Sequence, residues 1–149
     1  MADRDLVSLY SGRLLELASD IPMVGRLEAP DASVRKRSPQ CGSAVTVDLN
    51  VRNDVVKAFA QDVKACALGQ AAASVLGAVV IGRSHRELAD ARDALAAMLT
   101  SDGPVPAGHF SGFEALLPAR DFKNRHASIL LAIEATVEAF EAAEKADCA

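Results

Sequence analysis

Apolar and polar residues alternate in the middle of the chain. From Ser43 to Val51 every second residue is apolar, and this period of two predicts a half-buried β-strand whose polar residues point away from the core. Residues 52–54 predict a tight turn, which leads into a second strand from Val55 to Val63. Because a two-stranded hairpin is marginal alone, we expect a third strand around 32–36.

The segments on either side of the strands carry helical patterns. Apolar spacing predicts a helix over about 6–18, and residues 66–81, apolar on nearly all sides, predict a buried helix. Residues 84–87, Ser-His-Arg-Glu, have the sequence of a capping box that opens a further helix. Residues 111–114 predict a second capping box for a short turn that ends at Pro118. A last helix is expected from about 124 to 146.

The order of these elements indicates the fold class. One helix, then three strands, then a run of helices is typical of an α+β fold. We therefore expect a three-stranded antiparallel sheet covered on one face by helices, with an N-terminal helix and a long C-terminal helix. The length of 149 residues fits a single domain over residues 1–149.

Composition and charge narrow the classes of function. The net charge of −4 argues against nucleic acid as a partner, because phosphate binding requires a surplus of Lys and Arg. The sequence contains no run of 18 apolar residues, so no membrane-spanning helix is expected. The acidic N-terminus does not resemble a signal segment. We therefore expect a cytoplasmic protein without a membrane partner. No phosphate loop or dinucleotide fingerprint is present.

Cys41 and Cys66 are the candidate chemical groups. Cys41 precedes the first strand of the hairpin and Cys66 follows the second, so the hairpin should bring both to one edge of the sheet. Cys66 also begins a helix, where backbone N–H groups favour a thiolate, and Lys64 would add to this effect. Metal binding and sulfur transfer both require a thiolate. The alternative is that the two cysteines are buried, inert residues of the core.

Three segments resemble the IscU/NifU/SufU family of iron–sulfur cluster assembly scaffolds, over about residues 20–145. Residues 39–43 (PQCGS) resemble the Cys-Gly-Asp segment that leads into a strand. Residues 65–74 (ACALGQAAAS) resemble the helix that the second family cysteine opens. Residues 113–131 resemble the third segment, in which a cysteine, often after a histidine, opens the last helix.

The resemblance implies a function and a set of ligands. Family members accept sulfide from a cysteine desulfurase together with iron, build a [2Fe–2S] cluster on three cysteines plus Asp or His, and pass it on. Some members bind zinc and accept sulfur instead. By position, Cys41 and Cys66 match the first two cysteines and His126 matches the histidine. Ser43 stands where the family has Asp, and Ala127 stands where it has the third cysteine.

These departures leave three hypotheses open. The first is an atypical, non-enzymatic scaffold or carrier for iron, zinc or a nascent [2Fe–2S] cluster, with Cys41, Cys66, His126 and weakly Ser43 as ligands. A [2Fe–2S] cluster normally has four protein ligands, so a second copy of the chain in a homodimer or a small thiol would complete the site. The second is a zinc-containing sulfur acceptor for a cysteine desulfurase, with Cys66 as the acceptor. The third is a metal-free interaction protein that retains the fold, in which His126 only makes local hydrogen bonds.

Overall fold

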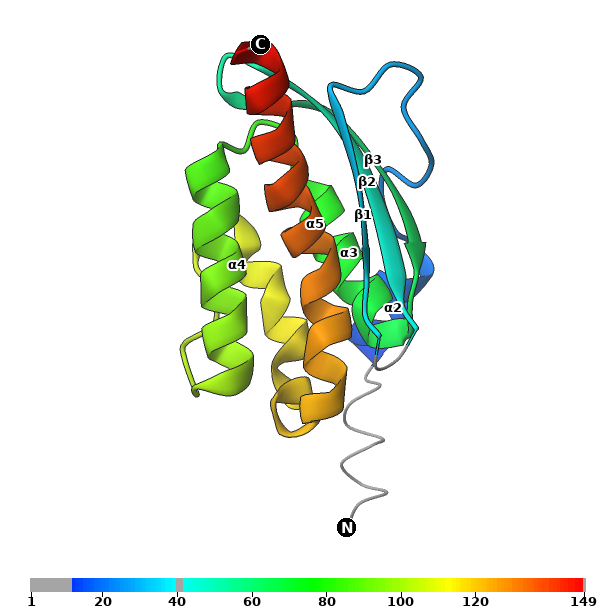
Figure 1. Ribbon diagram of the computed structural model, residues 1–149. Coiled ribbons are helices and arrows are strands. Elements are labelled where there is room, and N and C mark those ends of the chain that lie inside the picture. Colours follow the sequence, from blue (N-terminus) through cyan, green and yellow to red (C-terminus); the bar gives the residue numbers. More distant parts are fainter. Residues whose placement is uncertain (1–11, 40–41, 149) are drawn as a thin grey trace.

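The computed structural model describes residues 12–39 and 42–148 (Figure 1). Its sheet has three antiparallel strands, β1 (Ala32–Arg37), β2 (Ala44–Arg52) and β3 (Val55–Lys64), in the order β1-β2-β3. The predicted α+β class and all three strands are confirmed. The 52–54 turn is also confirmed, because Asn53 and Asp54 both adopt positive φ, at 56° and 64°. Two adjacent residues with positive φ give the turn a twist that matches the strands on either side.

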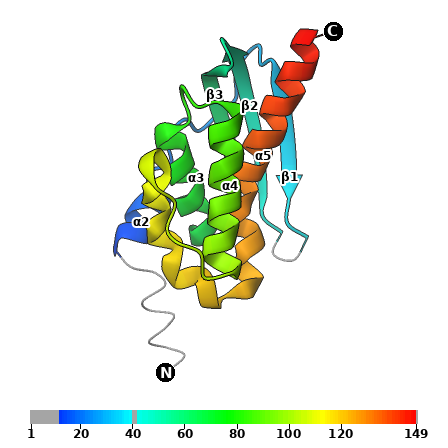
Figure 2. The same ribbon diagram turned by 90° about the vertical axis from the view of Figure 1, so that its left-hand side faces the viewer.

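The helices of the described residues form two layers beside the sheet (Figures 1 and 2). They are α2 (Gly12–Ser19), α3 (Ala67–Val79), α4 (His85–Thr100), the 3₁₀ segment η1 (Gly108–Asp121) and α5 (Lys123–Cys148). α5 packs on β1 and β2 and α3 lies beside it, while α4 and η1 cover these two helices from outside. The largest fully buried side chains come from both layers and from the sheet: Leu14, Leu49, Leu68, Leu76, Leu88, Leu95, Met98, Leu99, Phe113, Leu116 and Phe140.

The helix boundaries follow the sequence signals closely. The capping box at Ser84 is present, since its hydroxyl accepts the N–H of Glu87 and the Glu87 carboxylate accepts the N–H of Ser84. The buried helix begins directly after Cys66, as expected, and the long C-terminal helix begins at Lys123. Of the predicted N-terminal helix, residues 6–11 lie outside the described part of the chain, and the remainder is α2.

The second expected capping box is wrong. Residues 111–114 lie inside η1, which begins after Ala107 and continues through Pro118 to Asp121. A 3₁₀ helix has three residues per turn, so side chains three apart share one face. The buried residues of this segment are spaced in that way: Phe110, Phe113, Leu116 and Ala119.

The alternating pattern of β2 suggested that its outer face is open to solvent. The structure shows that part of this face is covered. Asp48 on that face is fully buried, because the segment of residues 22–31 passes over the side of the sheet that faces away from the helices (Figure 1). Arg26 donates to the Asp48 carboxylate at 2.7 Å, and the N–H of Leu27 and the hydroxyl of Ser33 donate as well. Val24, in the same segment, pairs in parallel with Gln61 at the free edge of β3.

Within the described residues, no helix is both long and apolar enough to cross a lipid bilayer.

Candidate functional site

Cys66 is the N-cap residue of α3, and its side chain is partly buried. Burial alone would raise the pKa of the Cys66 thiol. The backbone N–H of Gly69, the hydroxyl of Ser128, the N–H of Leu68 and the charge of Arg125 outweigh burial and lower that pKa. The sulfur makes no regular capping hydrogen bond, so the N–H groups act on it mainly through their partial positive charge. The site therefore favours a thiolate.

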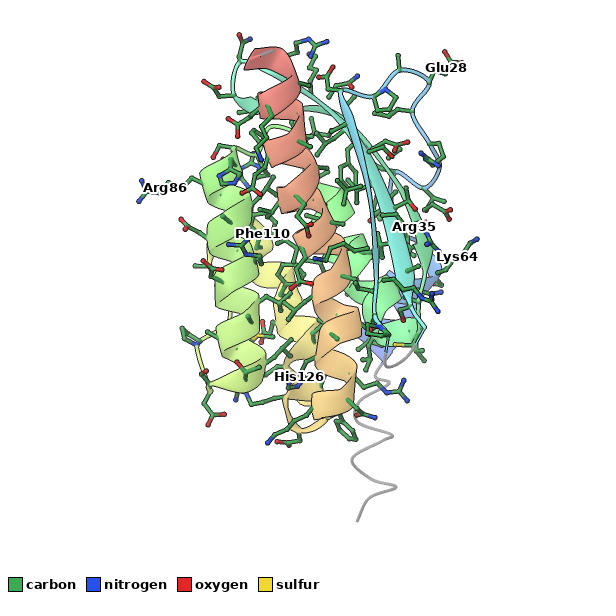
Figure 3. The ribbon with its side chains drawn as sticks, viewed as in Figure 1. Glu28, Arg35, Lys64, Arg86, Phe110 and His126 are labelled. Carbon is green, nitrogen blue, oxygen red and sulfur yellow. The ribbon has the colours of Figure 1, made fainter. Side chains whose placement is uncertain are left out.

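The cation that contributes to this effect is Arg125 rather than Lys64. Arg125 lies in the first turn of α5, and its positive charge acts on the Cys66 sulfur. Lys64 is exposed and stands on the sheet face that points away from the helices, as Figure 3 shows. The expectation that Lys64 supports the thiolate is thus replaced by a contribution from Arg125, which lies 59 positions after Cys66 in the sequence.

Two buried serines stand next to Cys66. The Oγ of Ser128, on α5, lies 3.6 Å from the Cys66 Sγ. The Oγ of Ser43, directly before β2, lies 3.1 Å from the Ser128 Oγ. Both serines are almost fully buried. The structure therefore connects Ser43 to Cys66 through Ser128, a residue that the sequence pattern did not indicate.

The loop that carries Cys41 is described only at its two ends. The N–H of Ser38 donates to the carbonyl of Ser43, and the N–H of Gly42 donates to the carbonyl of Ser38. Gly42 has a φ of +72°, which glycine adopts without strain. Cys41 itself lies outside the described residues, so its expected place beside Cys66 stays a prediction.

His126 lies in the first turn of α5, where η1 ends (Figure 3). It is buried, and its Nε2 stands 3.0 Å from both the Ala119 and Arg120 carbonyl oxygens. A carbonyl oxygen can only accept, so Nε2 carries a hydrogen, and in a neutral imidazole with that hydrogen on Nε2 the lone pair lies on Nδ1. Any ligation by His126 in this conformation would use Nδ1. Its described hydrogen bonds join it to η1, not to Cys66 or Ser43.

The donor set for a metal is correspondingly small. Among residues 12–39 and 42–148, no three His, Cys, Asp or Glu side chains gather as a metal site would require. Ala127, at the position of the third family cysteine, is exposed and offers no donor. Within the described part of the chain, Cys66 is the sulfur donor at this site.

Comparisons with known proteins identify the family to which this fold belongs. A family model, the NifU-like N terminal domain, matches residues 9–111. The crystal structure of a nitrogen-fixing NifU-like protein (N-terminal) from Brucella abortus is 44% identical, with a TM-score of 0.92 over 95% of this chain and 98% of that one. The chain belongs to the NifU-like N-terminal domain family.

Two more distant structures show the same fold. A putative iron–sulfur cluster assembly scaffold protein for the SUF system from Fervidobacterium islandicum AW-1 has a TM-score of 0.81 at 17% identity, over 89% of this chain and 96% of that one. A hypothetical protein solved at 2.3 Å resolution has a TM-score of 0.80 at 22% identity, over 89% of this chain and 97% of that one. The search of curated proteins gave no match.

Membership sets the general function. The family comprises NifU-like and SufU scaffolds of iron–sulfur cluster assembly. Its members bind iron–sulfur clusters and generally interact with cysteine desulfurases. The family model ends at residue 111, before His126 and Ser128, whereas the Brucella protein is similar over nearly the whole chain.

Proposed function

We propose that this chain is an atypical carrier in iron–sulfur cluster assembly, with Cys66 as the group that receives sulfur or metal. The observation that carries the proposal is the surroundings of Cys66. Its sulfur lies at the start of α3, next to a hydroxyl from α5 and near the charge of Arg125, and these groups lower the pKa of the thiol. Both metal ligation and sulfur transfer use the thiolate that this arrangement favours.

Cys41 is proposed as the second thiolate. It precedes Ser43 by two residues, so the Cα atoms of the two residues are at most about 7 Å apart. Ser43 is linked through Ser128 to Cys66. A cytoplasmic location, where thiols stay reduced, fits this use of two cysteines.

The number of donors decides which cargo one chain can hold. Cys41, Cys66 and the Nδ1 of His126 would leave one position of a tetrahedral iron or zinc site for an outside ligand. A [2Fe–2S] cluster normally needs four protein ligands, and Ala127 removes one of the family's donors. We propose that a complete cluster forms only when a second copy of the chain or a small thiol supplies the missing ligand.

Sulfur acceptance is the second candidate function, and the exposure of Cys66 favours it. The thiol is only partly buried and can meet a partner's cysteine persulfide. The Cys66 thiolate would attack the outer sulfur of that persulfide. A new S–S bond then forms on Cys66, the partner's S–S bond breaks, and the partner's cysteine leaves as a thiolate.

Anaerobic purification followed by iron, zinc and sulfide analysis tests the carrier function. Wild-type protein should hold close to one metal ion per chain, and Cys66→Ser and Cys41→Ser should each lose most of it. Cys148→Ser is the matched control, because its residue lies at the end of α5. Equal metal content in wild type and Cys66→Ser would contradict the carrier function.

Incubation with a purified cysteine desulfurase and cysteine tests sulfur acceptance. Intact-mass analysis should show one added sulfur on wild type and on Cys148→Ser, and none on Cys66→Ser. Sulfur addition without bound metal would favour the second function over the first. Absence of both metal and added sulfur in wild type would leave the metal-free interaction protein as the remaining hypothesis.

A further inference from the structure

Ser43 and Ser128, the two serines beside Cys66, form a series of contacts with each other and with the sulfur. Binding of a metal or cluster does not explain these contacts. Ser43 contacts Ser128 at 3.1 Å, and Ser128 contacts the Cys66 sulfur at 3.6 Å. The three residues come from different elements: the start of β2, the first turns of α5 and the start of α3. The contacts therefore join the sheet to both helices that cover it.

Ser128 differs in its hydrogen bonding from another buried hydroxyl on the same helix. Thr136 donates to the carbonyl of Ala132 four residues earlier, at 2.7 Å, which is the usual bond of a helical hydroxyl. The described bonds of Ser128 leave the helix, toward Ser43 and Cys66. Because buried hydroxyl groups are almost always hydrogen-bonded, these two contacts orient the Ser128 side chain.

The packing of α3 against α5 makes room for this hydroxyl. A Cβ added to Gly69 would lie 2.6 Å from the Ser128 Oγ and 3.1 Å from the Ser128 carbonyl oxygen. Only the absence of a side chain at residue 69 allows Ser128 to reach the start of α3. The closeness of Ser128 to Cys66 is thus built into the contact between the two helices.

We infer that Ser128 is a positioning residue for Cys66 and that Ser43 acts on the sulfur through it. A thiolate can only accept, so the Ser128 O–H donates to the sulfur, and the Ser43 O–H then donates to the Ser128 oxygen. In this series both hydroxyl protons point toward Cys66. The inference rests on the proposed function, because it concerns how Cys66 is held for reaction.

This order of hydrogen-bond donors gives a physical reason for serine, instead of aspartate, at residue 43. In the Cys-Gly-Asp segment that residues 39–43 resemble, this position is Asp, and an ionised carboxylate has no proton to donate. It would instead accept the Ser128 O–H and turn that hydroxyl away from the sulfur. A serine at residue 43 and a sulfur-directed Ser128 are therefore parts of one arrangement.

The rate at which Cys66 is alkylated tests the inference. Cys41→Ser and Cys148→Ser are combined so that Cys66 is the remaining thiol of the chain. Neutral iodoacetamide is added at one fixed pH, and intact mass follows the reaction. In this background, Ser128→Ala should slow alkylation about threefold, because the sulfur loses a donor and its fixed orientation. Ser43→Ala should slow it less.

The combined variant separates a relay from two independent effects. In the proposed relay the effect of Ser43 on the sulfur passes through Ser128, so Ser43→Ala should slow alkylation little further once Ser128 is alanine. Ser43→Thr, which keeps the hydroxyl, should restore the rate, and Ser43→Asp should slow alkylation at least as much as Ser128→Ala. Ser74→Ala is the matched control, because Ser74 is a buried serine of α3 that donates to the Asp20 carbonyl instead.

Two results would overturn the inference. One is an unchanged alkylation rate in a folded Ser128→Ala protein, with folding checked by thermal unfolding. The other is independent, multiplying effects of the two alanine substitutions. The alkylation rate reports on the Cys66 thiol whether or not the chain carries metal or added sulfur. If the relay is confirmed but the protein binds no metal and accepts no sulfur, only the proposed function is rejected. Cargo binding with an unaffected alkylation rate would reject the relay alone.

Discussion

Gly69 of α3 faces Ser128 of α5 so closely that a Cβ on Gly69 would lie 2.6 Å from the serine oxygen. The same Cβ would lie 2.8 Å from the Cβ of Ala65. Neither neighbour is the far end of a long flexible side chain, so the two helices would have to move apart. Residue 69 therefore sets how near α5 approaches the cysteine that begins α3.

Gly69→Ala should destabilise the protein although alanine is the better helix former. Alanine gains about 1 kcal/mol in a helix interior, whereas overpacking a close contact costs about 1–3 kcal/mol. We expect a net loss of about 1 kcal/mol in the free energy of unfolding, measured by urea denaturation. Gly12→Ala is the control, because nothing lies within 4 Å of its added Cβ. Equal stability of the two variants would show that the helix contact yields easily.

Asp48→Asn should lower stability near neutral pH and have little effect in acid. Burial alone would raise the pKa of Asp48, but hydrogen bonds from Arg26, Ser33 and the N–H of Leu27 outweigh it and lower the pKa below its ordinary 3.8. Ionised Asp48 therefore stabilises the fold above that value, and this contribution disappears as the pH falls through the lowered folded-state pKa.

The expected loss for Asp48→Asn at pH 7 is about 1–3 kcal/mol in the free energy of unfolding. Chemical denaturation of wild type and variant at pH 7 and pH 2.5 measures it, and the difference between them should shrink in acid. Asp90→Asn should change little at either pH, since its pair with Arg86 is long, at 3.8 Å, and exposed. A difference that stays constant with pH would rule out the carboxylate's charge as the cause.

Ser84→Ala should remove the capping box that starts α4. The serine hydroxyl satisfies the N–H of Glu87, and loss of such a cap costs about 1 kcal/mol. For a chain of this length the melting temperature should fall by about 2–4 °C in a thermal scan. Ser111→Ala is the comparison, because Ser111 is exposed within η1 and caps no helix. A similar fall for Ser111→Ala would argue against the cap as the cause.

Two substitutions of His126 separate the roles of its two ring nitrogens. Glutamine places an amide N–H near the position of Nε2, so His126→Gln should keep the bonds to the Ala119 and Arg120 carbonyls and most of the stability. Asparagine reaches only as far as Nδ1, so His126→Asn should lose about 1–3 kcal/mol in the free energy of unfolding.

Metal analysis of the same two variants tests ligation by His126. If Nδ1 binds the metal, His126→Gln should lose most of its iron or zinc while staying folded. Full metal content in folded His126→Gln would instead assign this residue to the junction between η1 and α5 alone.

Much of the fold could be predicted because its signals are local. The strand pattern of residues 43–63, the capping residues at Ser84 and the helix start at Cys66 each depend on neighbouring residues, and the structure confirms them. The burial of Asp48 could not be predicted in this way. It depends on Arg26 and Leu27, more than twenty residues earlier, crossing the outer face of the sheet.

The misread η1 segment did carry a signal. Its apolar residues recur every three positions from Phe110 to Ala119, which is the period of a 3₁₀ helix and lies between the strand period of two and the α-helix period of 3.6. Ser128 carried no comparable signal. Its importance comes from the close contact between α3 and α5, and a serine inside a helical pattern does not show which neighbour it meets.

The length of α5 separates the reactive end of the molecule from its C-terminal end. Ser128 contacts Cys66 near one end of this helix, and the helix runs on to Cys148 at the opposite end of the molecule (Figure 1). At 1.5 Å per residue, the backbone at 148 stands about 30 Å from that at 128. A bead or sensor surface attached at the C-terminal end would therefore leave Cys66 facing the solution.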